Sequence, residues 1–166
     1  MKNESNIKPC TLEIERHGEC AEVIFRENIT EEAREIDGGS EAVYTYDEYR
    51  LTVPNRETLL QAVEEAKAKW LEKAKRAEYD ALASAVREKR DKLLAETDAR
   101  MCFDRMGLSV PTETTFAAWL SFLSGLGNVL SGEWAKYRQA LRDIPQQEGF
   151  PYHVEFPTMP EYEKQE

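Results

Sequence analysis

The sequence predicts an α+β protein: a small N-terminal antiparallel β-sheet, one long central α-helix, a short C-terminal helical hairpin and an extended tail of proline and aromatic residues. Three observations support this fold class. Short apolar and β-branched runs with alternating polar neighbours occupy the first 54 positions, as in half-buried strands. A narrow apolar stripe with helical spacing starts at Leu59. Four prolines follow position 144, where they end helices and keep the backbone extended.

We therefore expect four segments in the 166 residues. These are a small β-rich domain (1–54), the long helix (55–97), a helical C-terminal region (98–145) and the extended tail (146–166). A chain of this length can form one domain with a modest core, or a small domain with an arm.

The N-terminal segment should form two to four strands. Leu12 and Ile14 pair with the run Val23-Ile24-Phe25 through a turn at Gly18. A brief helix is expected after Thr30, and the run at 42–54 then returns as a strand, with its tyrosines packed on the sheet.

The long helix should begin with Asn55 as its N-cap and run unbroken to about residue 96. Its apolar stripe consists of Leu59, Val63, Ala66, Trp70, Ala74, Ala77, Ala81 and Ala85. The mixed charges around this stripe fit a solvated helix with i,i+4 pairs. They also fit a coiled-coil arm that meets another chain, so a homo-oligomer through this helix stays open.

Three short helical pieces are expected before the tail. The first runs from Thr97 to Gly107, and the second ends at Gly125 and Gly127. The second piece would bury Phe116, Trp119, Leu120 and Leu123, and the third would begin with Ser131 as N-cap. The second and third would form the hairpin, with an aromatic core of Trp119, Phe122, Trp134 and Tyr137.

The composition argues against several classes of function. The formal net charge is −10, with 33% charged and 41% hydrophobic residues, so nucleic acid and anionic membranes are poor partners. We expect no signal peptide, because the first residues lack an apolar core. No run approaches the roughly 20 apolar residues that span a bilayer.

We expect neither a cofactor nor a metal. Cys10, Cys20 and Cys102 form an odd set without a close pair, which does not suit a disulfide framework or a zinc site. His17 would give only three clustered ligands. With two histidines, no phosphate-binding glycine loop and no Gly-x-Ser-x-Gly, we expect no enzyme and no catalytic residue.

The C-terminal part resembles a known family. The stretch from Trp134 to Pro145 reads Trp-x-x-Tyr-Arg-Gln-Ala-Leu-Arg-Asp-Ile-Pro, and Phe156-Pro157 follows after a short polar stretch. It resembles the C-terminal signature of phage tail assembly chaperone and tail fibre assembly proteins. The segment Arg90–Asp98 is similar to the piece that precedes this signature, so the resemblance covers about residues 87–160. Ala99 and Phe156 stand where the family usually has an aromatic residue and a tryptophan. The segment between the two matching pieces is longer and more apolar here.

The resemblance implies a chaperone that binds a phage tail or tail fibre protein and assists its folding or oligomerisation during virion morphogenesis in the bacterial host cytoplasm. The residues expected to bind this partner are Trp134, Tyr137, Arg138, Leu141, Arg142, Phe150, Pro151, Phe156 and Pro157. The two arginines could instead pair with carboxylates of this chain, and the tail could wrap its own domain.

Two other classes remain open. One is a structural tail component retained in the virion, as a cap on a fibre or baseplate. The other is a cytoplasmic coiled-coil adaptor, if the C-terminal match is fortuitous.

Overall fold

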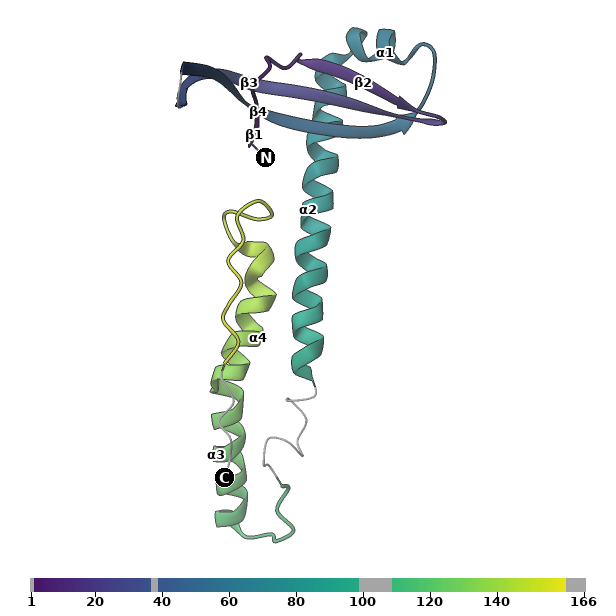
Figure 1. Cartoon of the computed structure of the whole chain (residues 1–166). Coiled ribbons are helices and arrows are strands. Elements are labelled where there is room, and N and C mark those ends of the chain that lie inside the picture. Colours follow the sequence, from purple (N-terminus) through teal and green to yellow (C-terminus); the bar gives the residue numbers. More distant parts are fainter. Residues whose placement is uncertain (1, 37–38, 99–108, 161–166) are drawn as a thin grey trace. The chain divides into compact units, whose positions relative to one another are not determined.

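The structure, a computed structural model, describes residues 2–36, 39–98 and 109–160 (Figure 1). It confirms the predicted α+β class, with a four-stranded antiparallel sheet, a long central helix and further C-terminal helices. The chain divides into two compact units, Met1–Ala81 and Leu82–Glu166. The long helix contributes residues to both units, and the division into four segments stays a prediction.

Four strands form the sheet of the first unit in the order β1-β4-β3-β2. They are β1 (Lys2–Ser5), β2 (Leu12–His17), β3 (Cys20–Ile36) and β4 (Gly39–Pro54). Gly18 joins β2 to β3 with a φ of 60°, a conformation that costs glycine little. Leu12 lies opposite Phe25, as the predicted β2–β3 pairing requires.

The prediction of a brief helix after Thr30 is wrong. Residues 30–36 instead continue β3 beyond an irregularity between Glu27 and Thr30, and they pair with residues 39–45 of β4 (Figure 1). Pairing with β4 satisfies the backbone groups of this segment, and such tertiary pairing overrides a local helical preference.

One face of the sheet forms the core of the first unit. Ala21, Val23 and Phe25 of β3 pack with Leu59, Val63 and Ala74, which come from the helices α1 (Leu59–Glu65) and α2 (Lys67–Asp98). The first half of the predicted apolar stripe therefore buries against the sheet. Each of these six side chains is at most 5% exposed.

The long helix differs from the prediction at its start. It is interrupted at Ala66, which has φ −131° and ψ 36°. Asn55 does not cap it: its side chain donates to the Gly18 carbonyl oxygen at 2.9 Å and accepts from Arg16 at 2.5 Å. The amide is thus bound to the β2–β3 turn, and α1 begins only after Thr58.

The second half of the stripe also differs. Ala81 and Ala85 are exposed, and Ala83 is buried instead. At about 100° per residue, Ala83 lies on nearly the opposite side of the helix from Ala85. The stripe predicted from spacing is therefore not the side of α2 that is buried at this point.

The opposite face of the sheet carries a network of ion pairs. Its charged members are Glu13, Glu22, Arg26, Glu48 and Arg50. Arg26 lies 2.7 Å from Glu48 and 2.8 Å from Glu13, and Arg50 lies 2.9 Å from Glu48. Ile24 pairs in register with Glu13 and Arg50 and is fully buried. The aliphatic stems of the network can cover an apolar side chain on this face.

The second unit contains α3 (Phe116–Ser131), α4 (Glu133–Asp143) and the 3₁₀ helix η2 (Ile144–Gln146), together with the end of α2. Only Gly132 separates α3 from α4. A helical hairpin needs a loop of about two to five residues, so the predicted hairpin is replaced by two consecutive helices. The piece expected from Thr97 to Gly107 lies mostly outside the described residues.

Three further expectations about α3 are wrong. The helix does not end at Gly125 or Gly127, because its hydrogen bonding continues to Ser131. Ser131 is not an N-cap either, since its hydroxyl donates to the Gly127 carbonyl oxygen at 2.9 Å. Finally, α3 contains no buried residue. Trp119 and Phe122 contact each other edge to face at 5.9 Å, within this exposed helix. They therefore do not join the predicted aromatic core.

We predict that Glu48→Gln lowers the free energy of unfolding by about 2 kcal/mol at pH 7, because it removes a largely buried carboxylate that accepts from two arginines. Burial alone would raise the pKa of Glu48, but the hydrogen bonds and charges of Arg26 and Arg50 outweigh it and lower the pKa. The carboxylate therefore stabilises fully above its unfolded-state pKa, and this contribution disappears as pH falls through the lowered folded-state pKa.

The measurement is urea unfolding of wild type and Glu48→Gln from pH 7 to pH 3. The difference in the free energy of unfolding between the two proteins should become smaller as the pH falls toward 3. Glu32→Gln, at an exposed position of β3, is the control and should stay within about 0.5 kcal/mol of wild type. A difference that is independent of pH would contradict the role given to the Glu48 charge.

Candidate partner-binding site

The residues of the predicted partner-binding site gather around α4 in the second unit. Tyr137, Leu141 and Ile144 are buried there and form the centre of what we call the C-terminal cluster. The partly buried members of this cluster are Val86, Leu93, Leu94, Trp134, Phe150, Val154 and Phe156. They come from α2, α4 and the tail, so the cluster joins three segments. The apolar stripe predicted on residues 134–144 is therefore the face that packs into this cluster.

Arg138 fixes α4 to the end of α2. Its guanidinium donates to the Leu94 carbonyl oxygen at 2.9 Å, to the Thr97 hydroxyl at 2.5 Å and to the Asp98 carboxylate at 2.6 Å. These acceptors lie in the last turn of α2, where backbone carbonyls lack helical partners and a positive charge is favourable. Arg138 is only 9% exposed. Of the two roles considered for this arginine, the structure shows the pairing within the chain.

Arg142 lies one turn further along α4 and has a different environment. Its side chain is exposed, and it makes no ion pair or side-chain hydrogen bond within the described parts of the chain. The Arg142 guanidinium is therefore available to a carboxylate or carbonyl group of another molecule.

The tail follows a defined course beside α2. The Gln147 side chain donates to the Glu155 carbonyl oxygen at 2.8 Å and accepts from the Glu155 amide at 2.9 Å. Gly149 stands where the chain returns on itself: a Cβ there would lie 2.3 Å from the His153 carbonyl oxygen. Only glycine allows this approach.

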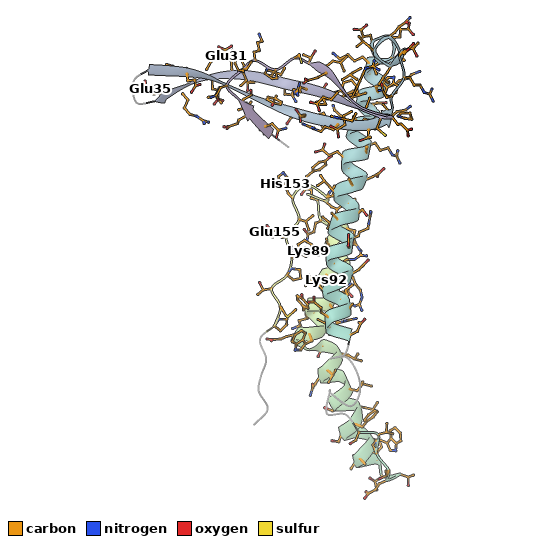
Figure 2. All side chains as sticks on the ribbon, turned by 45° about the vertical axis from the view of Figure 1, so that its right-hand side comes forward. Glu31, Glu35, Lys89, Lys92, His153 and Glu155 are labelled. Atoms are coloured by element: carbon orange, nitrogen blue, oxygen red, sulfur yellow. The ribbon has the colours of Figure 1, made fainter. Side chains whose placement is uncertain are left out.

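Basic side chains of α2 contact the aromatic rings of the tail. The Arg87 guanidinium lies 5.3 Å from the Phe150 ring centre, and the Lys89 ammonium lies 4.1 Å from that of Phe156. Figure 2 shows Lys89 and Lys92 on the side of α2 along which His153 and Glu155 run. Such cation–π contacts contribute about 0.5–1 kcal/mol each at exposed sites. No local pattern in the sequence indicates these pairings, because the partners are more than 60 residues apart.

The environment of Tyr137 agrees with a packed core. Burial raises the pKa of its phenol, and the negative charge of Glu96 raises it further. Trp134 meets the Tyr137 ring edge to face at 6.1 Å, a favoured arrangement for two aromatic rings.

The nine predicted residues thus fall into three groups. Tyr137, Arg138, Leu141 and Pro151 are buried, whereas Trp134, Phe150, Phe156 and Pro157 are partly buried and Arg142 is exposed. The buried residues hold α4 and the tail in place. Of these nine residues, Arg142 and the outer sides of the partly buried residues are accessible to another molecule.

The described residues show no group of three or more potential metal ligands. Cys10 and Cys20 are exposed thiols, and Cys102 lies outside the described ranges. No helix in the described parts of the chain is long and apolar enough to cross a bilayer.

We predict that Arg138→Met lowers the free energy of unfolding of the second unit by about 2–3 kcal/mol, because the acceptors on α2 lose a charged, largely buried donor. Arg138→Lys should recover only part of this, since an ammonium cannot reproduce the fork of donors. Thermal unfolding followed by Tyr and Trp fluorescence measures both. Arg142→Met, one turn away, is the control and should change stability by less than about 0.5 kcal/mol. Equal effects at the two positions would contradict the anchoring role of Arg138.

Comparison with known families finds a match in the C-terminal part of the chain. Residues 83–161 match the family model described as phage tail assembly chaperone protein. The match begins in α2 and includes α3, α4 and the tail, and it confirms the resemblance found in the sequence. No curated protein and no solved structure matches the chain.

Proposed function

We propose that this chain, whose residues 83–161 carry the phage tail assembly chaperone domain, binds a tail or tail fibre protein and assists its folding or oligomerisation. The family match carries this proposal, since it assigns a general role in phage tail assembly. The finer statement, that the partner is an immature subunit bound in the host cytoplasm, goes beyond the match.

The mechanism we propose is shielding. Immature subunits of an assembly expose apolar surfaces and unpaired strand edges that otherwise promote aggregation. A small folded unit that covers such a surface would keep the subunit soluble until its own neighbours replace the cover. The C-terminal cluster supports this proposal, because it holds α4 and the tail in a fixed arrangement before any partner arrives.

The end of the tail has the features of a segment that adds to a partner. Residues 156–160 lie in no helix or strand, and the described structure gives them no main-chain hydrogen bond. An extended segment with free backbone groups can pair with the open edge of another sheet. Met159 is 39% exposed in this segment and could enter a side-chain pocket there.

The proposed contact residues differ in what they contribute. Arg142 would make the direct polar contact, and Phe156 and Pro157 would present the outer side of the tail. Tyr137, Arg138, Leu141, Phe150 and Pro151 would act by holding this surface in shape, with Trp134 at its border. Substitution of the second set should therefore alter stability and binding together, whereas Arg142 should alter binding alone.

The test is co-expression of the chain with the tail or tail fibre protein encoded beside it. We expect the full chain to raise the yield of soluble, correctly oligomeric partner. Arg142→Glu should weaken binding about tenfold or more, which corresponds to about 1.4 kcal/mol, while thermal stability is unchanged. Lys136→Glu, an equally exposed charge reversal on α4, is the matched control and should bind as wild type.

Three outcomes separate the alternatives. If the full chain neither binds the partner nor changes its yield, the proposed function is wrong and a cytoplasmic adaptor becomes the better hypothesis. If the chain is found stoichiometrically in purified particles, it is a structural component. Recovery only from infected-cell lysate supports a chaperone that leaves after assembly.

A further inference from the structure

The helix α3 combines a charge-free sequence with an exposed apolar face, while Phe122, Leu126 and Val129 along one edge of it are half-buried. Its 16 residues, Phe-Ala-Ala-Trp-Leu-Ser-Phe-Leu-Ser-Gly-Leu-Gly-Asn-Val-Leu-Ser, include no Asp, Glu, Lys, Arg or His, although a third of the whole chain is charged. No residue of α3 is buried. Phe116 is 83% exposed, Leu130 63% and Leu123 56%. An exposed apolar surface of this kind marks an interaction site in a soluble protein.

The apolar residues of α3 form one wide face. At about 100° per residue, the large side chains fall within an arc of about 180°, which is half the circumference. Its exposed part is about 100° wide and consists of Phe116, Trp119, Leu120, Leu123 and Leu130, and its half-buried edge consists of Phe122, Leu126 and Val129. The other half carries only small or uncharged polar side chains, among them Ala117, Ser121, Ser124 and Asn128. The helix thus presents one face that water does not solvate well.

We propose that α3 is the helix by which this chain docks on its tail or tail fibre protein, with the wide apolar face inserted into an apolar groove of that protein before it assembles. This inference rests on the proposed function, which supplies the class of partner. The surface it names is distinct from Arg142 and the tail. Insertion of an amphipathic helix into a groove is a common mode of recognition, in which residues at i, i+3, i+4 and i+7 fill the groove. Phe116, Leu120 and Leu123 have this spacing.

The size of the contact favours a groove over a second copy of α3. A helix packed against one other helix buries a single stripe, whereas a groove encloses more of the circumference of α3. The contact between two copies would be small. A helix of 16 residues is about 24 Å long and, with a contact strip about 10 Å wide, offers about 240 Å² in projection. A stable interface needs about 800 Å² from each partner.

Charge further favours a groove of a different protein. Two copies of this chain each carry a formal net charge of −10 and repel each other. The residues that flank α3 on either side, Glu113 and Glu133, are acidic. A groove whose rim is neutral or basic would complement them, whereas a second copy would place like charges together.

A lipid surface fits the helix poorly. Amphipathic helices that lie on membranes carry Lys and Arg on the polar face, where these residues meet anionic headgroups. The face opposite the apolar arc of α3 has neither. The high negative charge of the chain adds repulsion from anionic lipids.

The experiment uses the full chain and the purified tail or tail fibre protein encoded beside it. The double variant Leu123→Glu/Leu130→Glu places two carboxylates in the apolar face at exposed positions. The double variant Ser121→Glu/Asn128→Glu has the same spacing and charge on the opposite face, and it is the matched control. Both should fold as wild type, because neither pair is buried. Circular dichroism and thermal unfolding verify this.

We expect Leu123→Glu/Leu130→Glu to weaken binding by about 100-fold or more, since a carboxylate desolvated in an apolar groove is strongly disfavoured. The control should stay within about threefold of wild type. Hydrogen exchange of the wild-type complex provides a second measurement, in which the amides of α3 should gain protection when the partner is added.

Each other outcome has a definite meaning. Wild-type affinity in both variants, without protection of α3, overturns the docking role and leaves the proposed function intact. Absence of binding by wild type itself overturns both. If sedimentation shows self-association that only the Leu123→Glu/Leu130→Glu change abolishes, the occupant is a second copy and the groove is wrong. Flotation of wild type with anionic vesicles, lost in the same variant, would assign the face to lipid and also overturn the groove.

Discussion

The arrangement of the C-terminal unit depends on the contact of Arg138 with the end of α2. A single guanidinium bonds a backbone carbonyl oxygen, a hydroxyl and a carboxylate that all lie within five residues of α2. Because the C-terminal end of a helix attracts positive charge, this contact fixes where α4 meets α2. Tyr137, Leu141 and Ile144 can then pack beneath it, and the tail returns over the same cluster. Without Arg138 these segments would share an apolar cluster with no fixed register.

The residues of the C-terminal signature could have served either the core of this unit or a partner. Trp134, Tyr137 and Leu141 read as an apolar stripe in the sequence, and such a stripe can serve a core or a partner equally well. In the structure Tyr137 and Leu141 serve the core of the unit itself. The exposed apolar surface lies instead on α3, which the hydrophobic pattern assigned to the core. The covered stripe and the exposed apolar surface thus lie on different helices of the same unit.

Several local predictions failed for one shared reason. Asn55 is a good N-cap by composition, yet its amide is bound at the β2–β3 turn. Residues 30–36 could form a short helix, but a second strand lies beside them. Ala85 continues a regular stripe, whereas the buried position nearby is Ala83. Contacts outside the local segment decide such cases: the Asn55 amide binds a carbonyl group 37 residues away, and residues 30–36 pair with β4. The prediction of a helical hairpin failed for a different reason, because the glycines at 125 and 127 are tolerated within α3.

The sequence by itself determined the α+β class, the β2–β3 hairpin at Gly18, the long helix, the α4 stripe and the resemblance of the C-terminal part to a family. These features depend on local periodicity, turn chemistry and an ordered motif. Only the tertiary structure decided which apolar faces are covered. It paired Arg138 with the end of α2, placed Lys89 on Phe156, buried Ile24 on the face of the sheet that carries the ion pairs, and left the large residues on one side of α3 exposed. Burial depends on what lies opposite a face, and the residues of the face alone do not contain that information.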